Sequence, residues 1–438
     1  MKNVLLLALL LCVRLLTGQA ELLQSGPMVG YSDMREVLLW VQTKAAAKVS
    51  FDYWEKGKKD ARIYHTATVE TSPATAFTAK LVADSVQQGR RYEYLLRINA
   101  RPVPRPYPTE FQSQELWQWR HDPPDFSVAV GSCFYVNEPA YDRPGRPYGS
   151  HYEILDAIYQ KHPDMMLWLG DNVYTREGDY TRTGFFHRYT HTRSLPELQP
   201  LLASVHHYAI WDDHDYGPND SDGSFVLKDV ALETFKLFWG NPSYGINGKP
   251  GITTRFSFND MDFFALDNRY YRAANHRTTG ERTMLGEEQL QWLISSLKES
   301  KAPFKFVLLG GQVLNLTPKY ETYEHYFPEE RRRLLELIDK EQIKGVVFLT
   351  GDRHHTELCT YRTPSGIEVY DLTVSPLTSG TPKKLEDDST LVVPGTIVLE
   401  HNFGLLRFTG PRKARVMHIE IYDADGQLLW QKEIAAPK

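Results

Sequence analysis

From about residue 122 onward, apolar runs alternate with helix-like segments, and this alternation constrains the fold most strongly. The helix-like segments carry apolar residues three or four positions apart, and they are residues 151–161, 286–300 and 329–341. The apolar runs are typical of buried strands: FSVAVGSC, MMLWLGD, HYAIWDDHD, FFALDNRYY, FKFVLLGGQ, VVFLTGDRHH and YDLTVSPL. Strands that alternate with helices predict a layered α/β domain.

Polar residues gather at the carboxyl ends of these runs, where open α/β sheets place their ligands. Chance could place polar residues there once or twice, but the pattern recurs in all seven runs. A single shared site is therefore the economical explanation.

The N-terminal part has a different pattern. From Gln24 to about Arg101, short alternating segments such as VLLWVQT and RYEYLLRIN predict a small all-β sandwich of the immunoglobulin or fibronectin type. The stretch 101–111 carries four prolines, which cannot continue a central strand, so it marks the passage between domains. We expect the β-sandwich at 21–110 and the α/β domain at 122–438, whose segments after about residue 385 form a terminal strand set.

The first twenty residues, 1–20, have the layout of a secretory signal peptide, with an apolar stretch that ends in small residues at Gly18 and Ala20. Arg14 interrupts the apolar run, which is already shorter than the ~18 residues of a spanning helix. Cys12 lacks the small residue that should precede a lipid-modified cysteine. We therefore expect an exported protein, periplasmic or extracellular, with no stable membrane insertion.

The net charge of the chain limits the possible binding partners, and its length indicates the number of domains. Removal of the first twenty residues takes away Lys2 and Arg14 and moves the net charge from −5 to −7, which argues against a nucleic acid bound through its phosphates. No nucleic-acid-binding module is evident, and nothing in the sequence sets an oligomeric state. About 418 remaining residues exceed the usual size of one core and suggest two domains.

Asp171 and Tyr174 directly follow residues 165–169, all of which are apolar. A buried aspartate at such a strand end is costly unless it is paired or coordinated. A carboxylate that bridges two cations would remove that cost, and a strand-end Asp-Asn turn is the plain alternative.

Asp212, Asp213, His214 and Asp215 are consecutive ionisable groups whose mutual repulsion needs a counter-charge. A solvated acidic loop is the alternative interpretation. Such loops seldom have a tryptophan directly before them, as Trp211 is here, and a Gly-Pro pair close behind. The segment therefore favours metal binding.

Asp352, His354 and His355 follow an apolar run and a glycine that lets the backbone approach a bound group. Neutral imidazole is the commonest nitrogen donor for transition metals. A lone histidine pair would suggest a surface loop, but beside two clusters of the same construction, coordination is favoured.

Cys133 ends a further apolar run, and its thiolate could bind zinc or ferric iron. A disulfide with Cys359, the only other cysteine beyond the first twenty residues, is the competing interpretation. The residues alone leave both open.

Seven short motifs occur in order between residues 126 and 380: G-S-C at 131–133, G-D-N-V-Y at 170–174, W-D-D-H-D-Y-G-P-N-D at 211–220, L-D-N-R-Y-Y-R at 266–272, L-G-E-E-Q-L-Q-W-L at 285–293, G-D-R-H-H at 351–355 and S-P-L-T-S-G at 375–380. Together they resemble the PhoD-like (alkaline phosphatase D) family of the metallophosphoesterase superfamily. The resemblance implies a four-layer α/β/β/α sandwich with a binuclear metal centre.

The metals that the resemblance implies are ferric iron and calcium, with zinc, manganese or cobalt as alternatives. It implies Cys133 and Tyr174 as iron ligands, Asp171 as the bridging ligand, and Asp352 with His354 to complete the set.

Further positions follow the family less closely. Asp213 and His214 take the place of an asparagine and a histidine of the wider superfamily, and Asp212 is expected as a ligand or as an outer neighbour of one. His355 is expected to orient a neighbour. Gln312 stands where many members carry a histidine, so one ligand of the second metal is weakened to an amide or lost. The chain also ends in strand-like segments rather than in a covering helix, which predicts a more open site.

The resemblance implies hydrolysis of small phosphate monoesters or diesters by a metal-activated water. His214 is expected to donate to the phosphoryl or leaving oxygen, with Asp213 and Arg269 as the other catalytic candidates. A guanidinium could neutralise charge in the transition state, and those that follow site-bearing strands are Arg143, Arg176, Arg269 and Arg353.

Two alternatives stay open. A phospholipase D-like phosphodiesterase would be expected to carry a basic or amphipathic docking face, and none is evident. A secreted binding protein that has lost catalysis would be colourless and free of metal, whereas tyrosinate bound to ferric iron absorbs visible light.

Overall fold

The computed structural model describes residues 21–385 and 389–438, and the expected signal peptide lies outside this range. The chain divides into two units. The first contains residues up to Leu116 together with residues 193–207 and 237–240, and the second contains the rest.

The first unit is a β-sandwich. One layer is the run β1-β2-β6 of a nine-stranded sheet, and the other is a sheet with the order β4-β3-β7-β8, with β5 paired to β3 and β9 to β7. The strands are β1 (Leu23–Ser32), β2 (Val37–Thr43), β3 (Lys48–Glu55), β4 (Tyr64–His65), β5 (Val69–Glu70), β6 (Thr78–Ala83), β7 (Arg91–Ile98), β8 (Arg101–Val103) and β9 (Glu110–Gln112). Leu39 and Leu81 of one sheet share an apolar core with Phe51 and Tyr94 of the other, as the alternating pattern predicts.

The second unit holds two sheets, with the orders β21-β20-β19-β10-β11-β12 and β13-β14-β15-β16-β18-β17. The strands of the first are β10 (Phe126–Gly131), β11 (Met165–Leu169), β12 (His206–Ile210), β19 (Asn402–Thr409), β20 (Val416–Asp423) and β21 (Leu428–Ala435). Those of the second are β13 (Thr254–Phe258), β14 (Met261–Ala265), β15 (Lys305–Leu308), β16 (Val346–Thr350), β17 (Glu357–Arg362) and β18 (Glu368–Thr373).

These two sheets face each other. The ring of Phe408 on β19 lies 5.5 Å from that of Phe306 on β15, and Phe126 on β10 lies 5.4 Å from Phe258 on β13. The C-terminal strands, predicted as a terminal set, extend the first sheet, because β19 pairs antiparallel with β10 and continues into β20 and β21.

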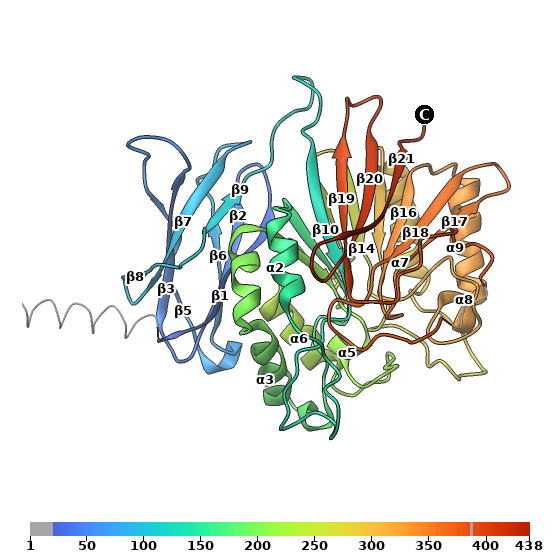
Figure 1. The fold of residues 1–438 in the computed structure, drawn as a ribbon, viewed down its shortest axis with the longest axis horizontal. Coiled ribbons are helices and arrows are strands. Elements are labelled where there is room, and N and C mark those ends of the chain that lie inside the picture. The colour runs from blue at the N-terminus through green and yellow to red at the C-terminus, as the bar shows by residue number, and fades with distance from the viewer. Residues whose placement is uncertain (1–20, 386–388) are drawn as a thin grey trace, which may run out of the picture. The chain divides into compact units, whose positions relative to one another are not determined.

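Helices lie outside the two sheets, with α2 on one side and α7 and α9 on the other (Figure 1). The helices are α2 (Glu153–Gln160), α3 (Arg182–Arg193), α4 (Gln199–Ser204), α5 (Asp213–Tyr216), α6 (Lys228–Phe238), α7 (Glu287–Glu299), α8 (Tyr323–Tyr326) and α9 (Pro328–Lys340). Leu290, Leu293 and Leu297 of α7 form one buried stripe against the second sheet. The predicted four-layer α/β/β/α architecture is confirmed. Within the described residues, no helix has the length and apolar character of a membrane span.

The directions of the strands determine where the loops that follow them meet. β10 and β11 run parallel, and so do β14, β15, β16 and β18. Parallel strands end at the same edge of a sheet, so the loops that follow them meet there.

Candidate active site

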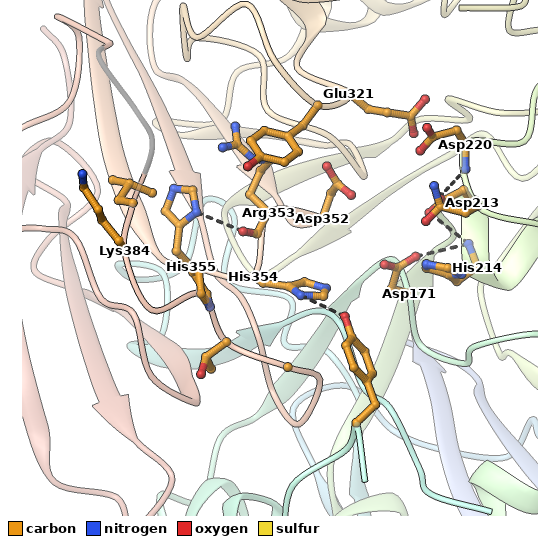
Figure 2. Close-up of a pocket in the computed structure, with 17 residues that line it drawn as sticks. Asp171, Asp213, His214, Asp220, Glu321, Asp352, Arg353, His354, His355 and Lys384 are labelled. Atoms are coloured by element: carbon orange, nitrogen blue, oxygen red, sulfur yellow. Dashed lines mark hydrogen bonds between the residues drawn. The ribbon is translucent and has the colours of Figure 1, made fainter. Parts of the chain in front are cut away.

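A cavity of about 520 Å³ lies where these loops meet (Figure 2). Its lining includes Asp171 after β11, Asp213 and His214 after β12, and Asp352 and His354 after β16. Three segments that are far apart in the sequence thus supply carboxylates and imidazoles to one space.

Several of these groups lie close enough to share a metal ion. Cys133, Asp171 and His354 form one set, and Asp171, Asp213 and His214 form another; within each set the ligand atoms lie within 4.8 Å of one another. Asp171 belongs to both sets, as a carboxylate that bridges two cations would. The donor types, a thiol, carboxylates and imidazoles, suit a transition metal.

Three hydroxyl groups surround the His354 ring. Tyr174 Oη lies 3.2 Å and Ser379 Oγ 3.3 Å from Nε2, and Tyr148 Oη lies 3.3 Å from Nδ1. Tyr174, expected as an iron ligand, is therefore beside the first donor set, and the centre of its ring lies 4.3 Å from that of the tilted His214 ring.

Four of the predicted ligands adopt a backbone conformation that side-chain-bearing residues rarely take. The φ angles are 58° at Cys133, 51° at Asp171, 68° at Asp352 and 54° at His354. Each such residue costs on the order of 1 kcal/mol or more, so it persists only where the surroundings hold it. The cost is concentrated at the loops that carry the donors, which is typical of a functional site.

Carboxyl groups crowd the cavity. Burial, with the charge of Asp213 added, raises the pKa of Asp171 well above its usual range, and burial with Asp212 and Asp213 does the same for the pKa of Asp352. Bound cations would remove the repulsion. Burial and the charge of His214 lower the pKa of His354 to about 4, which keeps its imidazole neutral and free to act as a donor.

Arg269, expected to face the phosphoryl group, is instead buried behind the cavity wall and is not part of its lining. Its Nε donates to Asp212 Oδ1 at 2.5 Å, and its Nη2 lies 2.6 Å from Glu321 Oε2. Asp212 also lies within 4.8 Å of Asp213 and Asp352 through its ligand atoms. Arg269 therefore balances the charge of carboxylates that stand behind and beside the donor sets.

Gln312 holds an arginine at the cavity. Its Oε1 accepts from Arg353 Nη1 at 2.8 Å, and its Nε2 donates to Glu357 Oε1 at 2.7 Å. His355 Nε2 lies 3.1 Å from Glu357, so this histidine orients a neighbour. The Arg353 guanidinium also lies over the Tyr320 ring at 4.4 Å, and it lines the cavity.

Three lining residues that lie close to the predicted ligands were not expected from the sequence. Asp220 and Glu321 lie within ligand distance of Asp213, and Tyr148 contacts His354. Asp220 ends the long acidic motif, which could have drawn attention to it. Glu321 and Tyr148 follow no apolar run, so the strand-end pattern could not find them.

The disulfide alternative for Cys133 is wrong, because both it and Cys359 are free and buried. Cys359 belongs to the apolar core beneath α7 and α9, whereas Cys133 packs against Tyr135 and Tyr174. Burial raises the pKa of the Cys133 thiol to about 12.

Comparisons with known proteins agree with this geometry. A family model described as PhoD-like phosphatase matches residues 239–409, and one described as a domain of unknown function matches residues 20–116. Alkaline phosphatase D of Bacillus subtilis (strain 168) is 23% identical over 345 residues, which span 69% of this chain and 58% of that protein.

Solved structures share the fold. A structure of PhoD superposes with a TM-score of 0.76 at 17% identity, covering 95% of this chain and 93% of the other. A purple acid phosphatase from seeds of yellow lupin (Lupinus luteus) superposes with a TM-score of 0.66 at 12% identity, covering 94% and 74%.

Proposed function

Since this chain belongs to the PhoD-like phosphatase family, we propose that it is a metal-dependent hydrolase of phosphate monoesters and diesters. One observation carries the proposal: donors from three separate loops line one cavity, Cys133 lies close to two of them, and Asp171 is shared by two possible ligand sets. Such a carboxylate is what two neighbouring cations need between them.

The donor chemistry fits the metals that the family resemblance implies. Cys133, Asp171, Tyr174 and His354 would hold ferric iron, and Asp213 with Asp352 would contribute to the second ion, calcium or another divalent metal. When bound, the ions would polarise the phosphoryl group and supply a nucleophilic water at neutral pH.

The chain's own groups would orient the substrate and move protons. His214 lines the cavity next to Asp171, and we propose that it donates a proton to the leaving oxygen. Arg353 lines the same cavity, so it, rather than Arg269, would neutralise phosphoryl charge. Arg269 would act through Asp212, whose carboxylate it fixes.

A substrate panel combined with metal analysis tests the function. Protein purified with iron available should contain iron, absorb visible light through the Tyr174 phenolate, and hydrolyse para-nitrophenyl phosphate, bis-para-nitrophenyl phosphate or both. Metal-free, colourless protein that turns over neither ester would reject the proposal and favour a binding protein.

Export is part of the same proposal. If residues 1–20 act as a signal peptide, the protein recovered outside the cytoplasm should begin at Glu21. Full-length protein found only in the cytoplasm would reject export while leaving the hydrolase proposal intact.

A further inference from the structure

A second cavity, of about 300 Å³, adjoins the catalytic one. Tyr148, His214 and Asn219 line both cavities, so a group that enters the second passes the proposed proton donor. The catalytic cavity is rich in carboxylates, whereas the second is lined by Arg143 and Arg146.

The loop that carries these arginines is held at both ends. At its start, Asp142 Oδ1 accepts hydrogen bonds from Tyr135 Oη at 2.7 Å and from Arg176 Nη2 at 2.8 Å. At its end, the Asn137 side chain accepts from the Gly149 nitrogen at 2.9 Å and donates to the Gly149 oxygen at 2.8 Å. The loop is therefore a fixed part of the cavity wall.

Charge on this wall is unbalanced. Arg176 is buried and neutralised by Asp142. Arg143 and Arg146 are exposed, and neither has a carboxylate partner among the residues that the structure describes. Apart from Asp142, which neutralises Arg176, the described lining contains one acid, Glu177, so positive charge is in excess there.

Aromatic faces complete the second cavity. Tyr141 and Tyr148 are 52% and 46% exposed, so part of each ring is accessible to a ligand. Their rings can pack against a sugar or a base, while guanidinium groups pair with phosphate oxygens in a planar, two-point geometry.

We propose that the second cavity is a leaving-group subsite that selects phosphate esters whose leaving group carries a second phosphate on a ring, as in a nucleoside bisphosphate. The scissile phosphate would lie at the carboxylate-lined cavity, and the ring would pass Tyr148 and His214 to place the second phosphate against Arg143 and Arg146. The inference rests on the proposed hydrolase function and adds its substrate class.

The proposed subsite can be tested by comparing kcat/KM between substrates with and without the second phosphate. We expect the wild-type kcat/KM for a nucleoside bisphosphate to exceed that for either corresponding nucleoside monophosphate by about tenfold, the ratio that corresponds to 1.4 kcal/mol. In Arg143→Gln/Arg146→Gln the ratio should fall close to one, because no guanidinium then meets the second phosphate. Arg143→Lys/Arg146→Lys should keep part of it, since charge remains without the two-point geometry.

A matched control removes two arginines elsewhere. Arg332 and Arg333 are exposed on α9 and form ion pairs with Glu336 and Glu287 at the surface, so Arg332→Gln/Arg333→Gln should keep the wild-type ratio. A wild-type ratio near one, or an unchanged ratio in Arg143→Gln/Arg146→Gln, would overturn the subsite while hydrolysis itself stands. A wild-type protein that cleaves neither these esters nor para-nitrophenyl phosphate would overturn the hydrolase function, and the subsite with it.

Discussion

Asp171 is the residue on which both donor sets depend. Asp171→Asn should lower turnover at least about a hundredfold, because the shared charge between two cations is lost and each 1.36 kcal/mol of lost stabilisation costs tenfold in rate. Bound metal, measured by elemental analysis, should fall in parallel. Asp156→Asn, on the exposed face of α2, should change neither. Full activity in Asp171→Asn would reject the bridging assignment.

Two buried or half-buried arginines should respond differently to the same substitution. Arg353→Gln should reduce kcat/KM by about tenfold to a hundredfold and change Tm little, because Arg353 is half-buried and faces the cavity, where Gln312 and the Tyr320 ring hold it. Arg269→Gln should lower the stability by about 3–5 kcal/mol, because Asp212 would keep a buried charge without its cationic partner, whereas Glu321 would keep only Arg272. Kinetics and thermal unfolding of both variants separate the roles. A loss of activity in Arg269→Gln at unchanged Tm would indicate that Arg269 takes part in catalysis.

The elements show what the sequence could and could not predict. Apolar runs and their polar ends predicted the strands and the edge at which Asp171, Asp213 and His354 meet, because strand direction follows from the α/β alternation. The positive φ angles at Asp352 and His354 could not be predicted from the sequence, because neither residue type requires such a backbone conformation. Glu321 lies in a loop whose position depends on the whole fold, so no local pattern could assign it.

Strand β12 carries a histidine whose protonation opposes folding. Burial lowers the pKa of His207 to about 3, although its Nε2 lies 3.1 Å from the Leu201 oxygen. The unfolded chain binds a proton below about pH 6.5 while the folded protein does not until about pH 3, so stability falls as the pH falls through this window.

His207→Gln should remove that pH dependence. Between pH 7 and pH 5 the wild-type protein should lose about 2 kcal/mol more of its unfolding free energy than the variant loses. Urea unfolding of both proteins at the two pH values, with chelator present so that metal release does not contribute, measures the difference. Equal losses in the two proteins would show that His207 is protonated in the folded state or is accessible to water.

At the scale of the whole molecule, each unit has an apolar cluster of its own, and all proposed metal ligands belong to the second unit. A sequence with two patterns, one alternating and one α/β, predicts two such cores. The fixed arginine loop depends on Asn137 and Asp142, which bond across the loop rather than along a repeat, so its position could not be predicted from periodicity.

Metal removal should therefore destabilise the second unit. Each ion present at about a thousandfold above its Kd contributes about 4 kcal/mol to the unfolding free energy, so loss of one ion should lower Tm by roughly 8–16 °C and loss of both by more. Re-addition of metal should restore Tm. Calorimetry measures the shift. In Asp171→Asn, chelator should move Tm little, because the ions are already lost. Its metal-free form should be at least as stable as the metal-free wild type, because burial and the neighbouring Asp213 disfavour a charge at this position. A chelator shift of equal size in both proteins would place the stabilising ions away from Asp171.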